Sequence, residues 1–164
     1  DATFSLTDNL VALASVGITD AGYDKVLYDL NGDGVINGAD KALDLPRAAP
    51  VTYTLGLNHD LRLGGWGTMS SRISYAYRDE SAYTDNNLGI LDEQKQIDAG
   101  IDFHTAGGHW IFSVYGRNLL NKVLHGNDTQ LPTYISQTPL IPLGGTFAPL
   151  SKGRRIGIEV TYNL

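Results

Sequence analysis

Apolar and polar residues alternate along most of this chain, and the alternation is clearest at its end. There the apolar residues fall on every second position, at Ile156, Ile158, Val160, Tyr162 and Leu164, with polar or small residues between them. Successive side chains of a β-strand point to opposite faces, so this pattern predicts a half-buried strand. The pattern continues to the last residue, where chains usually fray, so this strand is expected to have partners on both edges.

The same period of two predicts further strands along the sequence. Residues 51–58 show it well, with Val51, Tyr53, Leu55 and Leu57 on one face. The expected strands are the end of a strand at residues 2–7, then Leu10–Thr19, 51–58, Thr68–Arg78, Lys95–His104, Trp110–Leu120 and Gly157–Leu164. The chain is therefore predicted to be an all-β, antiparallel, up-and-down meander.

The connections between these strands alternate between short and long. Short turns fall near residues 8, 64 and 106, and long loops near residues 35, 87 and 137. Outer-membrane barrels sort their connections in this way, with short periplasmic turns and long external loops, whereas a β-sandwich has no reason to do so. We therefore expect part of a large transmembrane β-barrel, open in isolation because about six full strands cannot close one.

The polar face of the predicted strands carries charged residues, and aromatic residues gather at the strand ends. Basic side chains facing lipid near the bilayer centre cost about 2–4 kcal/mol each, so the charged face is expected to line the barrel lumen. Its members are Arg72, Arg78, Asp98, Asp102, Arg117 and Glu159. Aromatic residues are expected to form two girdles, with Tyr53, Tyr75, Tyr77 and Tyr115 at the long-loop end and Trp66, Phe103, Trp110 and Tyr162 at the short-turn end.

Three segments near the end of the chain carry a family resemblance. They are Tyr115–Asn121 (YGRNLLN), Pro149–Arg154 (PLSKGR) and the terminal run Gly157–Leu164 (GIEVTYNL). At these residues the chain resembles the C-terminal part of TonB-dependent receptors, the active transporters of Gram-negative outer membranes. The terminal run also resembles the signal read by the barrel assembly machinery, at Gly157, Val160, Tyr162 and Leu164. It departs from the commonest form of that signal by ending in Leu rather than Phe.

The resemblance implies that residues 1–164 are a C-terminal fragment of a longer chain, whose barrel has about twenty-two strands. It implies energised import of a scarce nutrient, of the siderophore, cobalamin, saccharide or peptide class, across the cell outer membrane. The implied partners are membrane lipid and lipopolysaccharide, an N-terminal plug and further strands of the same chain, and the TonB energy-coupling complex acting through that missing part. Nothing in the sequence selects one substrate class.

Composition excludes several other functions. The sequence has no Cys, so disulfides, thiolate metal sites and Cys nucleophiles are excluded. A formal charge of −6 and the lack of a basic stripe argue against nucleic acid as a partner. His59, His104, His109 and His125 share no metal-ligand spacing, and no nucleophile with a base is visible, so the chain is not expected to be an enzyme.

One motif in the first long loop, residues 20–49, points to a metal ion. Between residues 29 and 40, oxygen-bearing side chains fall at positions one, three, five, nine and twelve, and Gly34 falls at six. This is the EF-hand spacing, in the dockerin-like form that ends in Asp, and Ca²⁺ prefers such oxygen ligands. The candidate ligands are Asp29, Asn31, Asp33, the carbonyl of Val35, Asn37 and Asp40, with Ile36 expected as a buried anchor.

Two alternatives remain open from the sequence. The motif can also be read as an Asx- and Gly-rich turn that only solvates a surface loop, and the chain as a soluble, calcium-dependent β-sandwich binding module. In the second long loop, Tyr83, Asp85, Asn86 and Asn87 could contact substrate, or could belong to an acidic rim facing lipopolysaccharide and cations.

Overall fold

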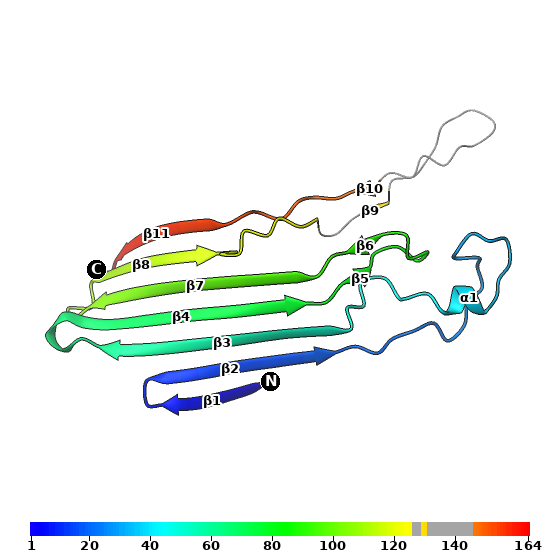
Figure 1. Ribbon diagram of the computed structural model, residues 1–164. Helices are drawn as coiled ribbons and strands as arrows, with labels where there is room; N and C mark the ends of the chain where they lie inside the picture. Colours follow the sequence, from blue (N-terminus) through cyan, green and yellow to red (C-terminus); the bar gives the residue numbers. More distant parts are fainter. Residues whose placement is uncertain (126–128, 131–145) are drawn as a thin grey trace.

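The computed structural model describes residues 1–125, 129–130 and 146–164, and its main feature is one seven-stranded antiparallel sheet (Figure 1). Strands adjacent along the chain are adjacent in the sheet, in the order β1-β2-β3-β4-β7-β8-β11. Their bounds are β1 Ala2–Thr7, β2 Leu10–Ile18, β3 Val51–Arg62, β4 Gly67–Arg78, β7 Gln94–Thr105, β8 Trp110–Arg117 and β11 Arg155–Tyr162. The predicted all-β antiparallel meander is confirmed, and the sheet is not closed.

The remaining elements are short. Strand β5 (Ser81–Ala82) pairs with β6 (Ile90–Leu91), β9 (Thr129–Gln130) pairs with β10 (Thr146–Phe147), and the helices are α1 (Gly38–Lys41) and the 3₁₀ turn η1 (Gly64–Trp66). No helix in the described residues has the length and apolar character needed to cross a membrane. The apolar, proline-containing stretch of the last long loop, residues 131–142, lies outside the described residues.

The connections are sorted by length between the two ends of the sheet. In Figure 1 the tight turns after β1, β3 and β7 lie at the left, and the long connections that carry α1, β5–β6 and β9–β10 lie at the right. The long connections between main strands are residues 19–50, 79–93 and 118–154. The predicted alternation of short and long connections is therefore observed, and we call the right-hand end of Figure 1 the long-loop end.

The sheet is a single layer, so one of its faces leaves apolar side chains uncovered. Val16, Ile156 and Ile158 keep 62%, 71% and 77% of their surface exposed, although they lie within long paired strands. Aromatic pairs lie near both ends of this face: Tyr53 stacks on Tyr77 with ring centroids 4.8 Å apart, and Trp110 lies 4.7 Å from Tyr162. An apolar surface of this extent marks a contact with lipid or with another protein.

This arrangement differs from a β-sandwich, in which a second sheet covers the apolar face. Apart from the seven-stranded sheet, the described strand pairings are the two-residue pairs β5–β6 and β9–β10, beyond the ends of the long strands. In the described part of the chain, no second sheet lies against the first.

Two predicted strand ends need correction. Strand β8 ends at Arg117 rather than Leu120, because Asn118 has a left-handed backbone with φ 51°. Strand β11 ends at Tyr162 rather than continuing to the terminus, so Leu164 lies beyond it and is fully exposed. Asn163 still donates a backbone hydrogen bond to the carbonyl of His109 (2.8 Å).

Candidate functional site

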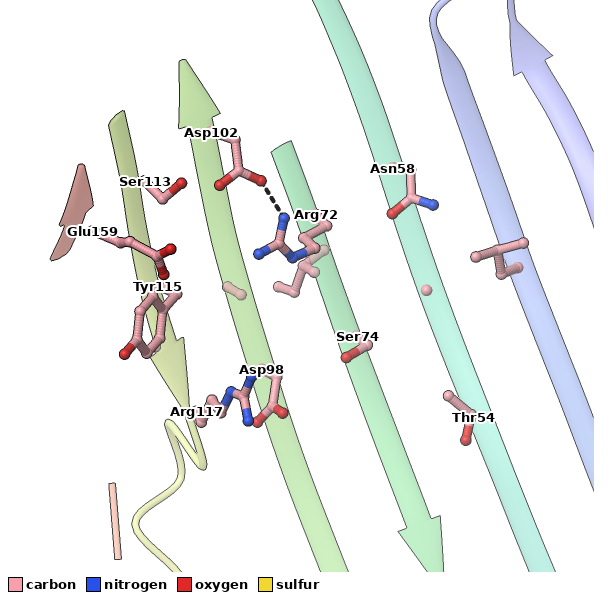
Figure 2. Close-up of a pocket in the computed structure, with 15 residues that line it drawn as sticks. Thr54, Asn58, Arg72, Ser74, Asp98, Asp102, Ser113, Tyr115, Arg117 and Glu159 are labelled. Carbon is pink, nitrogen blue, oxygen red and sulfur yellow. Dashed lines mark hydrogen bonds and ion pairs between the residues drawn. The ribbon is translucent and has the colours of Figure 1, made fainter. Parts of the chain in front are cut away.

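The charged face of the sheet forms a hollow of about 510 Å³ that is lined by residues of six strands, from β2 to β11 (Figure 2). Its position follows from register, because residues that oppose one another in an antiparallel pair lie on the same face. One row across β3, β4, β7, β8 and β11 consists of Asn58, Arg72, Gly100, Tyr115 and Gly157. The other polar residues that line the hollow are Thr54, Ser74, Asp98, Asp102, Ser113, Arg117 and Glu159. Five of the six charged residues predicted for this face therefore gather in one place.

In that row, glycines alternate with large side chains that lie along the sheet. A Cβ on Gly100 would come within 3.1 Å of the Arg72 guanidinium, so the glycine leaves the space that this group occupies. From there Arg72 forms an ion pair with Asp102, to which the Ser113 hydroxyl is also hydrogen-bonded. The Tyr115 ring covers Gly157 in the same way. The hollow is thus floored by flat polar and aromatic groups.

The position of Tyr115 corrects one prediction. Tyr115 was expected in the aromatic girdle at the long-loop end, but it faces the hollow, with the Arg117 guanidinium 5.9 Å from its ring centroid. Sequence parity could have placed it, because Ser113, Tyr115 and Arg117 are spaced by two and share one face. Glu159, on the neighbouring strand, directs its carboxylate into the same hollow (Figure 2).

The YGRNLLN segment has a structural role at the edge of this site. The Asn118 N–H donates to Asp98 (2.8 Å), and the Asn118 side-chain amide donates to the carbonyls of Lys122 (2.7 Å) and Lys152 (3.0 Å). Asn121 accepts a hydrogen bond from the N–H of Arg154 (2.9 Å). These two asparagines bend the chain out of β8 and join the two ends of the last long loop.

The four proposed assembly-signal residues lie on or just past β11, on both faces of the sheet. Val160 and Tyr162 are about half exposed on the apolar face. The Tyr162 ring stacks with that of His109 at 6.0 Å and lies tilted against that of Trp110 at 4.7 Å. Gly157 lies on the charged face under the Tyr115 ring, and Leu164 lies beyond the strand. The apolar part of the signal is therefore available on the free edge strand.

The candidate calcium loop is folded by hydrogen bonds between its own side chains and backbone. The Asp29 carboxylate accepts from the N–H groups of Gly32 (2.7 Å), Asp33 (3.2 Å) and Gly34 (2.7 Å). The carboxylate of Asp40, which is fully buried, accepts from Leu30 (2.7 Å), Asn31 (3.1 Å) and Asn37 (2.8 Å). Asn37 caps α1, and Asn31 and Asp33 accept from the backbone two residues further on.

Asp40, Gly34 and Ile36 of this loop differ in burial and in backbone conformation. Hydrogen bonds from backbone N–H groups lower the pKa of Asp40 below its ordinary value; the bond from Asn37 has the largest effect, and those from Asn31 and Leu30 add to it. Burial acts in the opposite direction and raises this pKa, but it does not outweigh the hydrogen bonds. Gly34 has φ 87°, as the sharp turn at position six requires. Ile36 is 55% exposed, so the expectation that it is a buried anchor is wrong.

The oxygen donors have the chemistry that Ca²⁺ prefers, but their placement alone does not define a metal centre. Within residues 1–125, 129–130 and 146–164, no group of three or more His, Cys, Asp or Glu side chains lies close enough together to hold a metal ion. Asp29 and Asp40 face different sets of backbone N–H groups. Calcium binding by this loop stays a prediction.

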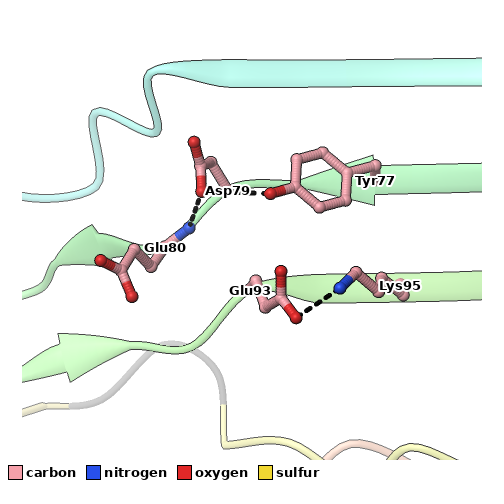
Figure 3. Close-up of polar contacts among 5 residues, drawn as sticks. All are labelled: Tyr77, Asp79, Glu80, Glu93 and Lys95. Atoms are coloured by element: carbon pink, nitrogen blue, oxygen red, sulfur yellow. Dashed lines mark hydrogen bonds and ion pairs between the residues drawn. The ribbon is translucent and has the colours of Figure 1, made fainter.

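A second polar cluster lies where β4 and β7 enter the second long loop (Figure 3). Lys95 pairs with Glu93 (Nζ to Oε1, 2.5 Å) and lies 5.9 Å from the Tyr77 ring centroid, and the Tyr77 hydroxyl donates to Asp79 (3.2 Å). The Asp79 carboxylate also accepts from the N–H of Glu80 (3.0 Å). Tyrosines, one cation and carboxylates therefore meet at the long-loop end of the apolar face.

Comparison with known proteins finds a structural relative. The sequence matches no protein-family model and no curated protein. The fold matches the crystal structure of the ferric yersiniabactin uptake receptor FyuA from Yersinia pestis, with a TM-score of 0.68 and 11% sequence identity. The match covers 98% of this chain and 22% of that receptor chain, so the chain spans about a fifth of its length.

The fold and faces therefore define an open wall segment of a β-barrel. More particularly, this meander has the fold of part of a TonB-dependent receptor barrel. The matched structure is that of an uptake receptor.

Proposed function

We propose that this chain is the C-terminal wall of a TonB-dependent outer-membrane receptor that imports a scarce nutrient by energised transport. One observation carries the proposal: nearly the whole chain superposes on part of an uptake receptor, with an exposed apolar face on one side of a single-layered sheet and a charged hollow on the other. A lipid-facing surface must be apolar because the bilayer core cannot solvate charges.

The proposal gives each surface a partner. The apolar face contacts outer-membrane lipid, and the cluster around Tyr77 and Lys95 lies at the level of lipopolysaccharide. The hollow faces the lumen and the plug supplied by the missing part of the chain, through which the TonB complex acts. The barrel assembly machinery reads Gly157, Val160, Tyr162 and Leu164. The substrate belongs to the siderophore, cobalamin, saccharide or peptide class.

The native protein tests this proposal. Membranes of the source organism are fractionated, and the polypeptide containing this sequence is identified and weighed. We expect it in the outer membrane, in a chain several times longer, and we expect deletion of its gene to abolish energy-dependent uptake of one nutrient. A short native chain in the soluble fraction would refute the receptor and favour the soluble calcium-dependent module instead.

We further propose that Ca²⁺ orders the loop at residues 29–40, through Asp29, Asn31, Asp33, the carbonyl of Val35, Asn37 and Asp40. Two features support this: the oxygen spacing in the sequence, and the way the loop turns around the Asp29 carboxylate, with Gly34 in a left-handed conformation. Residues 24–44 also carry a net charge of −3, which a bound cation would offset.

Limited trypsin digestion of the full-length protein measures this ordering. Calcium is expected to slow cleavage after Lys25 and Lys41 about tenfold relative to chelator, because binding to the folded loop lowers the population of its open form. Asp29→Ala should remove the protection, whereas Asp20→Ala, outside the motif, should keep it. Equal cleavage of the unaltered protein with calcium and with chelator would eliminate the metal role.

A further inference from the structure

The buried apolar side chains of the described residues do not lie between the long strands. They are Ala49, Ala82 and Leu91, with 7%, 3% and 4% of their surface exposed, and Ser81 beside them is 7% exposed. All four lie at the long-loop end, where residues 20–49 meet residues 79–93. A packed core in a protein marks the part that holds together by its own contacts. The junction of these two loops is such a part.

Two backbone hydrogen bonds lie at this junction: one joins the two loops, and the other joins the start of the second loop to the first residue of β3. The N–H of Arg47 donates to the carbonyl of Ala82 (2.6 Å), and the N–H of Asp79 donates to the carbonyl of Val51 (2.9 Å). On its other side, the second loop is closed by β5–β6 pairing and by the hydrogen bond from the N–H of Tyr83 to the carbonyl of Gly89 (2.9 Å). Arg47 has φ 64°, so the first loop turns sharply where it meets the second.

Asn87 makes the most specific connection between the loops. Its side-chain oxygen accepts from the N–H of Asp44 (2.7 Å), and its side-chain nitrogen donates to the carbonyl of Asp44 (2.9 Å). One amide thus satisfies both backbone groups of a residue 43 positions away, as a neighbouring strand would. The backbone N–H of Asn87 (3.0 Å) and its side-chain amide (3.3 Å) both donate to the carbonyl of Thr84. The backbone of Asn87 is left-handed, with φ 55°.

A third contact lies nearer the start of the first loop. The Tyr23 hydroxyl donates to the Asp85 carboxylate (3.3 Å). Burial, which has the larger effect, and the negative charge of Asp85 both raise the pKa of Tyr23 above its ordinary value. Tyr23, Asp44 and Arg47 of the first loop therefore each contact the second loop, and both loops line a common cavity of about 310 Å³ beside the sheet.

We propose that residues 20–49 and 79–93 form one joined cap at the long-loop end, which Asn87 holds together, so that the two loops become accessible together. Asp85 and Asn87, which the sequence suggests as possible substrate contacts, are then connectors between the loops. A ligand that displaces one loop would therefore have to break the Asn87–Asp44 pair or displace the other loop with it. The joined cap does not depend on calcium binding or on the nutrient transported.

Proteolysis at sites in both loops tests the joined cap in the full-length protein. Trypsin reports on the first loop at Lys25 and Lys41, and a Glu-specific protease reports on the second at Glu80 and Glu93. Asn87→Ala removes both hydrogen bonds to Asp44, so cleavage is expected to rise about tenfold in both loops. The matched control is Asn86→Ala. Among the described residues, the Asn86 side chain accepts from the N–H of Leu88 in its own loop (3.1 Å) and makes no hydrogen bond to the first loop, so cleavage at Lys25 and Lys41 should keep its normal rate.

Cross-linking of the two loops tests the joined cap if the Asn87→Ala variant fails to fold. The sequence has no Cys, so Tyr23→Cys with Asp85→Cys introduces the only thiols of this segment, for joining by a short bis-maleimide. Joining them is expected to slow cleavage at Lys41 and at Glu93 together. The proposal is overturned if the pair does not cross-link in the folded protein, or if Asn87→Ala exposes the second loop while the first loop is cleaved at the normal rate. The expected differences between these variants and the unaltered protein are the same with calcium and with chelator. The calcium proposal is tested by comparing calcium with chelator in the unaltered protein, so the two proposals can fail independently.

Discussion

Replacing Gly67 with alanine is expected to lower the stability of the folded protein by about 3 kcal/mol or more. Gly67 begins β4 with φ 137° and ψ −150°, a conformation in which glycine is almost the only residue found. An added Cβ would also run into the backbone carbonyl of His104 and lie 3.0 Å from the N–H nitrogen of Ala106. These are backbone atoms of the end of β7 and of the turn that follows it. The N–H of Ala106 donates to the carbonyl of Trp66 (3.0 Å), which ties the two turns together, so these atoms cannot swing aside.

The same turn supplies the control for this prediction. A Cβ on Gly65 would meet nothing within 4 Å, so Gly65→Ala is expected to stay within about 0.5 kcal/mol of the unaltered protein. Denaturant unfolding of the full-length protein in detergent or lipid measures both variants. Equal stabilities for the two would show that the close approach of the short turns does not constrain the fold.

Placing arginine at Ile73 is expected to cost about 2–4 kcal/mol in a bilayer, whereas arginine at Ser74 should cost little. The two residues are adjacent in the middle of β4 but face opposite sides of the sheet. Ile73 is 47% exposed on the apolar face, and Ser74 lines the charged hollow opposite Asp98. An arginine at 74 thus gains a carboxylate neighbour, while one at 73 loses its hydration to lipid.

Folding yield and unfolding free energy of both variants, in lipid bilayers, check this difference. A control in lipid-free detergent should reduce the gap, because micelles admit water more readily than a bilayer does. Ile73→Arg and Ser74→Arg with similar effects in bilayers would contradict the assignment of the apolar face to lipid.

Much of the fold follows from the sequence. The period-two pattern placed the main strands within a few residues, and it assigned Arg72, Asp102 and Glu159 to one face correctly. The reason is local: alternation is imposed by the covalent geometry of each strand, so it needs no knowledge of the partner strand. The sorting of the connections by length is equally visible without coordinates.

The sequence predicted less well where a residue's role depends on distant chain segments. The left-handed backbone of Asn118 ends β8, and its amide holds two points of the last loop, including Lys152, 34 residues away. Ile36 has the right spacing for a buried anchor, but no other part of the described chain covers it. Spacing along a loop specifies which groups could meet, and the fold specifies which do.

By itself, then, the sequence determined the strands, their two faces and the order of the meander, because these depend on local periodicity and chain connectivity. Only the tertiary structure decided that Tyr115 lies over Gly157 and that Asn87 joins two loops whose contacting residues are 43 and 62 positions apart. Such contacts depend on strand register and on how two irregular segments pack, and neither leaves a periodic signal in the sequence.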